Sequence, residues 1–200
     1  MRVLRFPFDE NLIPENGIYI MFGQNEKGHG SNRIVRVGTH TGQGQLRSRL
    51  KQHFLIENKD RSIFRKNIGR CILSKSKDSF FSQWELDLTS GTARRRYSGK
   101  VDFGKLRRVE KLVSRYIQRN FSFVVLPVKE KELRLHLESR IISTVSWCQE
   151  CLPSDHWLGK FSPKNKIRES GLWLVNELYK EPLSQEDMKH IQKIIQASEC

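Results

Sequence analysis

Residues 17–22 read Gly-Ile-Tyr-Ile-Met-Phe, and residues 34–38 read Ile-Val-Arg-Val-Gly. Both runs are rich in β-branched and aromatic residues, which favour strands. The stretch between them, residues 23–33, is rich in Gly, Asn and Lys, so the sequence predicts a β-hairpin with a long loop. After a turn at residues 39–44, apolar residues recur every four positions at Leu46, Leu50 and Phe54, which predicts a helix.

The rest of the chain predicts a small α/β fold. Residues 63–73 hold a short element, residues 121–128 (FSFVVLPV) form a strand, and a helix follows over residues 130–147. Near the N-terminus, alternating apolar residues at 4, 6 and 8 predict a short edge strand, and Ser184 to Asp187 is a capping signal for a C-terminal helix. We therefore expect a small three-stranded sheet flanked by helices, with extra C-terminal helices.

The predicted domain organisation is one domain over residues 1–180, with a C-terminal helix at 181–200 packed on it. The domain core comprises residues 17–73 and 121–148. Between these parts lies a basic insertion, residues 75–120, and after them an irregular extension, residues 149–180.

Charge is the strongest compositional signal. The 200 residues include 36 Lys and Arg against 22 Asp and Glu, a formal net charge of +14. Such a surface attracts polyanions, and nucleic acid is the commonest of these in a cytoplasm. An apolar fraction of 37% is enough for a core, while no apolar run reaches the roughly 18 residues of a membrane span. No secretory signal opens the sequence, so we expect a cytoplasmic protein without a membrane partner.

Four pieces occur in a recognisable order. They are Gly17-Ile18-Tyr19, the run Arg36-Val37-Gly38, the helix segment from Leu46 to His53, and Glu138 in the helix after the third strand. In this combination the sequence resembles the GIY-YIG nuclease family, over residues 17–73 and 121–148. The family includes the incision subunit of bacterial nucleotide excision repair, intron-homing endonucleases and type II restriction enzymes.

The resemblance implies a role for each matched residue. Tyr19 would take part in activating the attacking water, and Arg49 would face the scissile phosphate of DNA. His53 falls where relatives carry Tyr or His. Glu138 matches the single carboxylate that binds one divalent ion, Mg²⁺ or Mn²⁺. Arg36 stands where the second motif usually has a tyrosine; an arginine can contact phosphate but cannot act as a base.

The spacing of these residues supports the same grouping. Arg49 and His53 are four residues apart and share a helix face. Glu138 lies beside the apolar row of its helix, at the edge of the core. We therefore expect Tyr19, Arg49, His53 and Glu138 to converge on one cleft. The family's asparagine, usually found about a dozen residues after the glutamate, is missing there; Asn165 and Asn176 are later candidates.

Basic residues in the insertion form a candidate DNA-binding surface. Arg94, Arg95 and Arg96 lie in a Gly- and Ser-flanked stretch that suits a flexible loop. Four further basic residues recur at spacings of three and four on a predicted helix: Arg108, Lys111, Arg115 and Arg119. The alternative is that these charges only keep the protein soluble and do not contact DNA.

Several alternatives stay open. The length and the insertion favour a restriction-type enzyme, a homodimer if its target is palindromic, but a repair or mobile-element nuclease shares the same motifs. A catalytically inactive nucleic-acid-binding module would also keep the fold. Cys148 and Cys151 form a lone C-x-x-C for which His156 offers a third zinc ligand and nothing obvious offers a fourth. A deaminase pattern through His136 fails, because twelve helical residues would separate His136 and Cys148 by about 18 Å.

Overall fold

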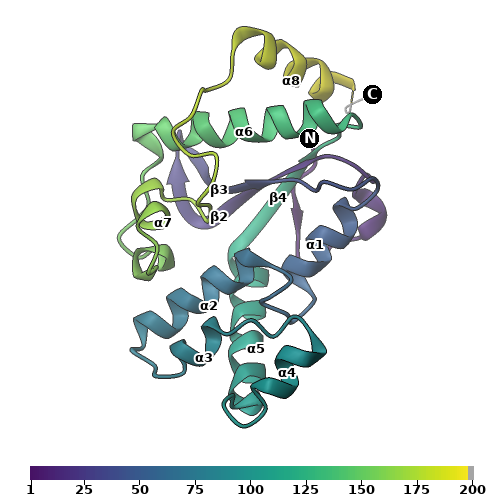
Figure 1. Cartoon of the computed structure of the whole chain (residues 1–200). Helices are drawn as coiled ribbons and strands as arrows, with labels where there is room; N and C mark the ends of the chain where they lie inside the picture. Colours follow the sequence, from purple (N-terminus) through teal and green to yellow (C-terminus); the bar gives the residue numbers. More distant parts are fainter. Residues whose placement is uncertain (198–200) are drawn as a thin grey trace.

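The fold is centred on a four-stranded antiparallel sheet with the strand order β1-β4-β2-β3. The structure is a computed structural model that describes residues 1–197 (Figure 1). The strands are β1 (Leu4–Arg5), β2 (Ile18–Gly28), β3 (Ser31–Gly38) and β4 (Phe121–Leu126). The α/β class is confirmed, but the expected count of three strands is wrong. The N-terminal arm, predicted as an edge strand, joins the sheet where Leu4 pairs with Phe123.

The β2–β3 hairpin is longer than the sequence suggests, and the prediction of a long loop at residues 23–33 is wrong. Only His29 and Gly30 form the turn, both with positive φ (49° and 73°), as a tight type I′-like turn requires. The polar residues remain in the strands because two of them pair inside the protein. The guanidinium of Arg33 donates to Glu26 over 2.9 Å, and both side chains are buried.

The two faces of the sheet bury different sets of side chains. On one face, Tyr19, Met21 and Phe123 pack against α1 (Leu46–Phe54), α2 (Ile63–Lys75) and α5 (Phe103–Asn120). On the other face, Ile18 and Val37 pack against α6 (Lys131–Trp147), whose outer side is covered by α8 (Gln185–Ala197). Figure 1 shows α6 and α8 on one side of the sheet, α1 to α5 on the opposite side, and α7 beside the sheet edge.

The insertion folds as a helical lobe around α2. It consists of α3 (Phe81–Glu85), α4 (Gly91–Arg96) and α5. Trp84 packs so closely on Gly69 of α2 that a Cβ there would lie 2.2 Å from the indole ring. The helix predicted through residues 108–119 is confirmed. The flexible loop expected at Arg94 to Arg96 is a short helix instead, because the Ser90 hydroxyl accepts the Ala93 N–H and caps it.

The chain after α6 returns across the sheet edge. It contains η2 (Gln149–Cys151), η3 (Leu158–Phe161) and α7 (Asn165–Ser170), and a short η1 (Glu10–Leu12) lies near the N-terminus. Trp173 then donates its N–H to the Val35 carbonyl over 2.8 Å, which brings residues 173–177 beside β3. The predicted cap of the last helix is confirmed, since Ser184 and Asp187 exchange side chain-to-backbone hydrogen bonds. Within residues 1–197, no helix combines the length and apolar character that crossing a bilayer requires.

Candidate active site

Tyr19 and His53 meet in the buried layer between the sheet and α1. Both side chains are fully buried, and the Tyr19 hydroxyl lies 2.9 Å from His53 Nε2. On the other side of the imidazole, Nδ1 lies 2.8 Å from the Ser62 hydroxyl, which also accepts the Arg65 N–H as the cap of α2. Both ring nitrogens of His53 are therefore hydrogen-bonded, one to the Tyr19 phenol and the other to the Ser62 hydroxyl.

The glycine that ends the second motif makes room for this phenol. Tyr19 and Gly38 are paired across β2 and β3. A Cβ at Gly38 would lie 2.2 Å from the Tyr19 hydroxyl, far inside van der Waals contact. The motif therefore needs glycine here so that the tyrosine hydroxyl can lie against the neighbouring strand.

Arg36 connects Tyr19 to the surface. Its Nε donates to the Tyr19 hydroxyl over 3.3 Å, and its Nη1 donates to the Trp173 carbonyl over 2.5 Å. The guanidinium also lies over the ring of Phe64, at 4.9 Å from the centroid. These contacts fix the guanidinium where it both touches the phenol and lines the adjacent cleft.

The environment of His53 keeps its imidazole neutral. Burial lowers the pKa of His53 well below its usual value, and the charges of Arg36, Arg49 and Arg65 lower it further. A protonated imidazole would be a fourth positive charge in a region without solvent. His53 is therefore suited to accept the phenol proton in a hydrogen bond and to orient Tyr19.

A cleft of about 460 Å³ opens between α6, the end of β3 and the segment after α7. Its lining includes Arg36, Glu138, Asn176 and Glu177. Glu138 is half-buried on α6, and the backbone N–H of Thr39 donates to its carboxylate. Burial raises the pKa of Glu138, while the positive charge of Arg36 opposes that shift. In the described part of the chain, Glu138 forms no ion pair, so a cation in the cleft would be its counter-ion.

A family model described as a GIY-YIG domain matches residues 2–199. The chain belongs to the GIY-YIG family. The match spans the insertion and the C-terminal helix as well as the core motifs, and it indicates a nuclease family whose members generally use divalent metal ions. Among curated proteins and among solved structures, none matches the chain.

Arg49 lies beside the GIY-YIG cleft rather than in its lining. It is half-buried in a neighbouring hollow with Thr39, Ser48 and Gln52, and its Nη1 donates to the Gln52 amide oxygen over 3.1 Å. Its charge acts on both His53 and Glu138. The structure thus places Arg36, Arg49 and Glu138 at adjoining surfaces. It places Tyr19 and His53 behind them, where α1 covers the sheet. The expectation that Tyr19, Arg49, His53 and Glu138 all converge on one cleft is therefore wrong, because of these four only Glu138 lines it.

Asn176 and Glu177 also line this cleft. Of the two asparagine candidates, Asn176 lines the cleft, whereas Asn165 lies on α7 and accepts a hydrogen bond from Arg168. Sequence reasoning missed Glu177, whose carboxylate accepts a 2.5 Å bond from Ser139 next to Glu138. No local sequence signal marks Glu177, because only the return of the chain past Trp173 brings it to α6.

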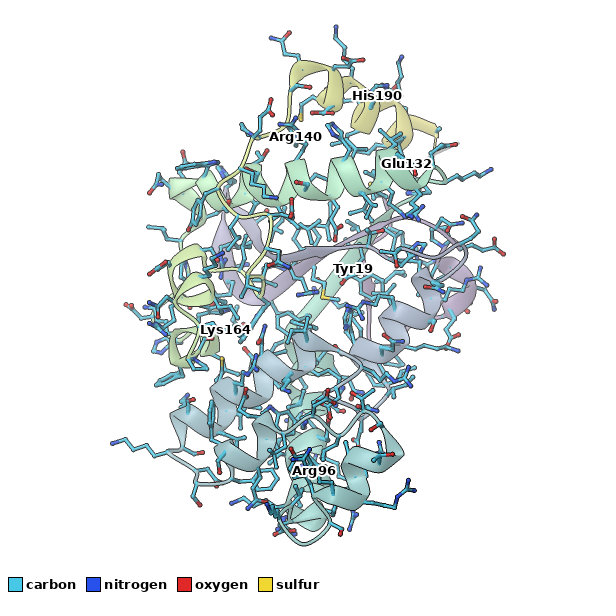
Figure 2. All side chains as sticks on the ribbon, viewed as in Figure 1. Tyr19, Arg96, Glu132, Arg140, Lys164 and His190 are labelled. Carbon is cyan, nitrogen blue, oxygen red and sulfur yellow. The ribbon has the colours of Figure 1, made fainter. Side chains whose placement is uncertain are left out.

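The predicted DNA-binding residues are all exposed and lie in the helical lobe, away from the cleft. Arg96 is seen there in Figure 2, well separated from Tyr19. Arg94 is partly fixed, since its Nε donates to the Leu88 carbonyl over 2.9 Å. The exposed set comprises Arg94, Arg95 and Arg96 on α4 and Arg108, Lys111, Arg115 and Arg119 on α5.

Proposed function

We propose that this GIY-YIG protein is a metal-dependent DNA endonuclease that hydrolyses phosphodiester bonds, of the restriction type. The observation that carries the proposal is the Glu138 carboxylate. It lines a cleft together with Arg36, and in the described residues it has no ion-pair partner. A surface carboxylate free of an ion pair next to guanidinium groups suits a site that receives a cation and a phosphate together.

The residues present fit one divalent ion, Mg²⁺ or Mn²⁺. Glu138 offers carboxylate oxygens, and the exposed Asn176 offers an amide oxygen in the same cleft. These are the hard oxygen ligands that Mg²⁺ and Mn²⁺ prefer. When bound there, such an ion supplies polarisation of a phosphoryl oxygen and stabilisation of the leaving oxygen.

The remaining residues act on the substrate and the attacking water. Arg49 and Arg36 present guanidinium groups that stabilise the charge gathering on the phosphoryl oxygens. Tyr19 takes part in activating the water, with its phenol held between the Arg36 Nε and the His53 Nε2. Neutral His53 keeps the phenol proton directed away from Arg36, so the phenol oxygen can accept from the Arg36 Nε.

DNA binding rests on the basic lobe. A formal charge of +14 and the eight exposed basic residues of α4 and α5, which are the seven predicted ones and Arg107, supply electrostatic attraction to the phosphate backbone. The basic residues lie away from the cleft, so a duplex bound by the lobe has to extend past α2, whose Ile63 and Asn67 line the cleft, to bring its backbone to Glu138. A palindromic target would bring two copies together, one for each strand.

The test is cleavage of a supercoiled plasmid with Mg²⁺, with Mn²⁺ or with EDTA. We expect cleavage only with metal, and its loss in Glu138→Gln with DNA binding retained. Glu132→Gln is the matched control, because Glu132 is exposed on the first turn of the same helix (Figure 2). Cleavage in EDTA, or full activity in Glu138→Gln, would contradict the proposal. Tight DNA binding without cleavage by the wild type would identify an inactive module instead, in which Arg36 has replaced a needed tyrosine.

A further inference from the structure

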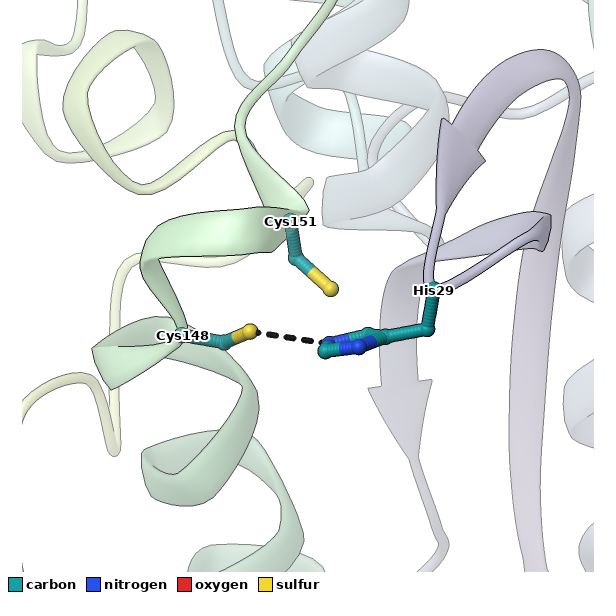
Figure 3. Close-up of side chains that lie close together, drawn as sticks. All are labelled: His29, Cys148 and Cys151. Carbon is teal, nitrogen blue, oxygen red and sulfur yellow. Dashed lines mark hydrogen bonds between the residues drawn. The ribbon is translucent and has the colours of Figure 1, made fainter.

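We propose that His29, Cys148 and Cys151 form a zinc site that joins the tip of the β2–β3 hairpin to the end of α6. Figure 3 shows the three side chains pointing toward one another, His29 from the hairpin and Cys148 and Cys151 from the segment that follows α6. Their ligand atoms all lie within 4.8 Å of one another, and His29 Nε2 is 3.1 Å from Cys148 Sγ. The site is separate from the Glu138 cleft and does not rest on the proposed nuclease activity.

The donor set and the spacing suit zinc. Tetrahedral zinc with Zn–S bonds of about 2.3 Å and Zn–N bonds of about 2.0 Å places its ligand atoms roughly 3.5–3.8 Å apart. The three ligand atoms lie within 4.8 Å of one another, so side-chain rotations that move them by about 1 Å or less bring them to that spacing. Two thiolates and an imidazole are soft or borderline ligands, which favour zinc over the Mg²⁺ proposed for the cleft.

The hairpin tip is shaped to place the imidazole and to admit a thiol. His29 has φ = 49°, and it occupies the first turn position, where Asn or Gly is usual. At Gly28, a Cβ would lie 3.1 Å from Cys151 Sγ. The absence of a side chain at Gly28 therefore allows Cys151 to approach the strand closely.

Glu150 supplies the contact that orients the histidine. Its carboxylate lies 3.3 Å from His29 Nδ1, on the side of the ring opposite Cys148. A carboxylate on one ring nitrogen directs the other nitrogen toward a metal. The side chains of His29 and Glu150 are 56% and 77% exposed, so a water molecule can occupy the fourth position.

The third ligand is not the one that the sequence indicates. His156 is close to the C-x-x-C pair in sequence, but it lines a separate pocket beside Tyr116 and Asn120. His29 lies 119 residues before Cys148. A zinc ion here would connect the hairpin that carries Tyr19 and Arg36 to the helix that carries Glu138.

The test is metal binding by the full-length protein, purified under reducing conditions, stripped of metal and then titrated with Zn²⁺ and with Co²⁺. We expect one zinc ion per chain and a thiolate-to-cobalt charge-transfer absorption. His29→Asn should abolish both signals, and Cys151→Ser should do the same. Asparagine before glycine suits the turn, so His29→Asn removes the imidazole without disturbing the hairpin. His156→Asn is the matched control and should bind zinc like the wild type.

Removal of the Glu150 carboxylate, which orients His29, should weaken zinc binding without abolishing it. Glu150→Ala should weaken zinc binding by about tenfold, the lower end of what loss of such a partner costs, since Glu150 is exposed. The proposal is overturned if His29→Asn binds zinc as tightly as the wild type. It is also overturned if the reduced wild type binds no zinc, including the case in which Cys148 and Cys151 only form a disulfide with each other on oxidation.

Discussion

The middle of α6 and the residue directly after it carry two groups of proposed metal ligands with different chemistry. Glu138, in the middle, faces a cleft with Arg36 and offers oxygen ligands beside a buried polar network. Cys148, directly after the helix, faces His29 at an exposed edge and offers sulfur. The difference indicates that one helix can position oxygen ligands for a proposed catalytic ion and sulfur ligands for a proposed structural ion. The proposed oxygen site lines a cleft that also contains Arg36, and the proposed sulfur site lies between the β2–β3 hairpin and the segment after α6.

The largest expected effect is on stability, and it contrasts the buried polar network behind the cleft with the exposed His29 site. Glu110 on α5 accepts from Arg65, whose side chain is fully buried below His53, and from the Lys59 N–H. Glu110→Ala leaves that arginine charge buried without its partner, which should cost about 3–5 kcal/mol of unfolding free energy. His29→Asn, at the exposed edge, should cost about 0.5 kcal/mol or less in metal-free protein. Urea denaturation of both variants measures this, and equal losses would contradict the contrast.

Loss of the buried phenol should affect catalysis at the cleft alone. Tyr19→Phe removes the hydroxyl that contacts both Arg36 and His53, so we expect cleavage to fall about 100-fold, as for loss of a general base. Plasmid cleavage under saturating DNA measures the rate. Tyr97→Phe, in the lobe, is the control and should cut normally. An active Tyr19→Phe enzyme would show that the phenol has only a packing role.

The basic lobe should determine the salt dependence of DNA binding. Replacing Arg94, Arg95 and Arg96 with Ala should lower the slope of log affinity against log salt by about 0.9 for each lost phosphate contact. The charge-matched control replaces Lys131, Lys189 and Lys193, which are exposed on α6 and α8. Fluorescence anisotropy at several salt concentrations measures both slopes. If the two triple variants behave alike, α4 does not contact the DNA.

The smallest expected effect is a pH dependence of the unfolding free energy, caused by the buried imidazole of His53. Burial and the charges of Arg36, Arg49 and Arg65 lower the pKa of His53 in the folded protein, whereas in the unfolded chain it stays near 6.5. Below that pH only the unfolded state takes up the proton, so stability should fall with decreasing pH, by at most about 1.4 kcal/mol per pH unit. His53→Gln lacks this group and should lose less stability between pH 6.5 and pH 5. If the unfolding free energies of the wild type and His53→Gln depend on pH in the same way, the assignment of a neutral His53 is contradicted.

Much of the fold followed from the sequence because local patterns specify it. The spacing of Leu46, Leu50 and Phe54 predicted α1, and the Ser184–Asp187 cap predicted the start of α8. Residues 23–33 were misjudged, because the buried Glu26–Arg33 pair allows a polar stretch to continue as strand. No local signal reports such a pair.

The candidate sites were less predictable because they depend on contacts between distant segments. The order of the motifs predicted Tyr19, Arg49 and Glu138 as site residues. The structure adds the cleft that Arg36 and Glu138 both line. Glu177 and His29 had no sequence signal. Each reaches its partners only through the path of a connecting segment: residues 173–177 beside β3 for Glu177, and the long hairpin for His29.

The central claim is that Glu138 binds a divalent ion, and Mn²⁺ binding tests it most directly. The binding is monitored by electron paramagnetic resonance, in protein whose proposed site at His29, Cys148 and Cys151 has first been saturated with zinc. The wild type should bind one Mn²⁺ ion per chain, and Mg²⁺ should displace it. Glu138→Gln should lose that binding, while His29→Asn should retain it. Undiminished Mn²⁺ binding by Glu138→Gln would contradict the assignment of the oxygen site to α6.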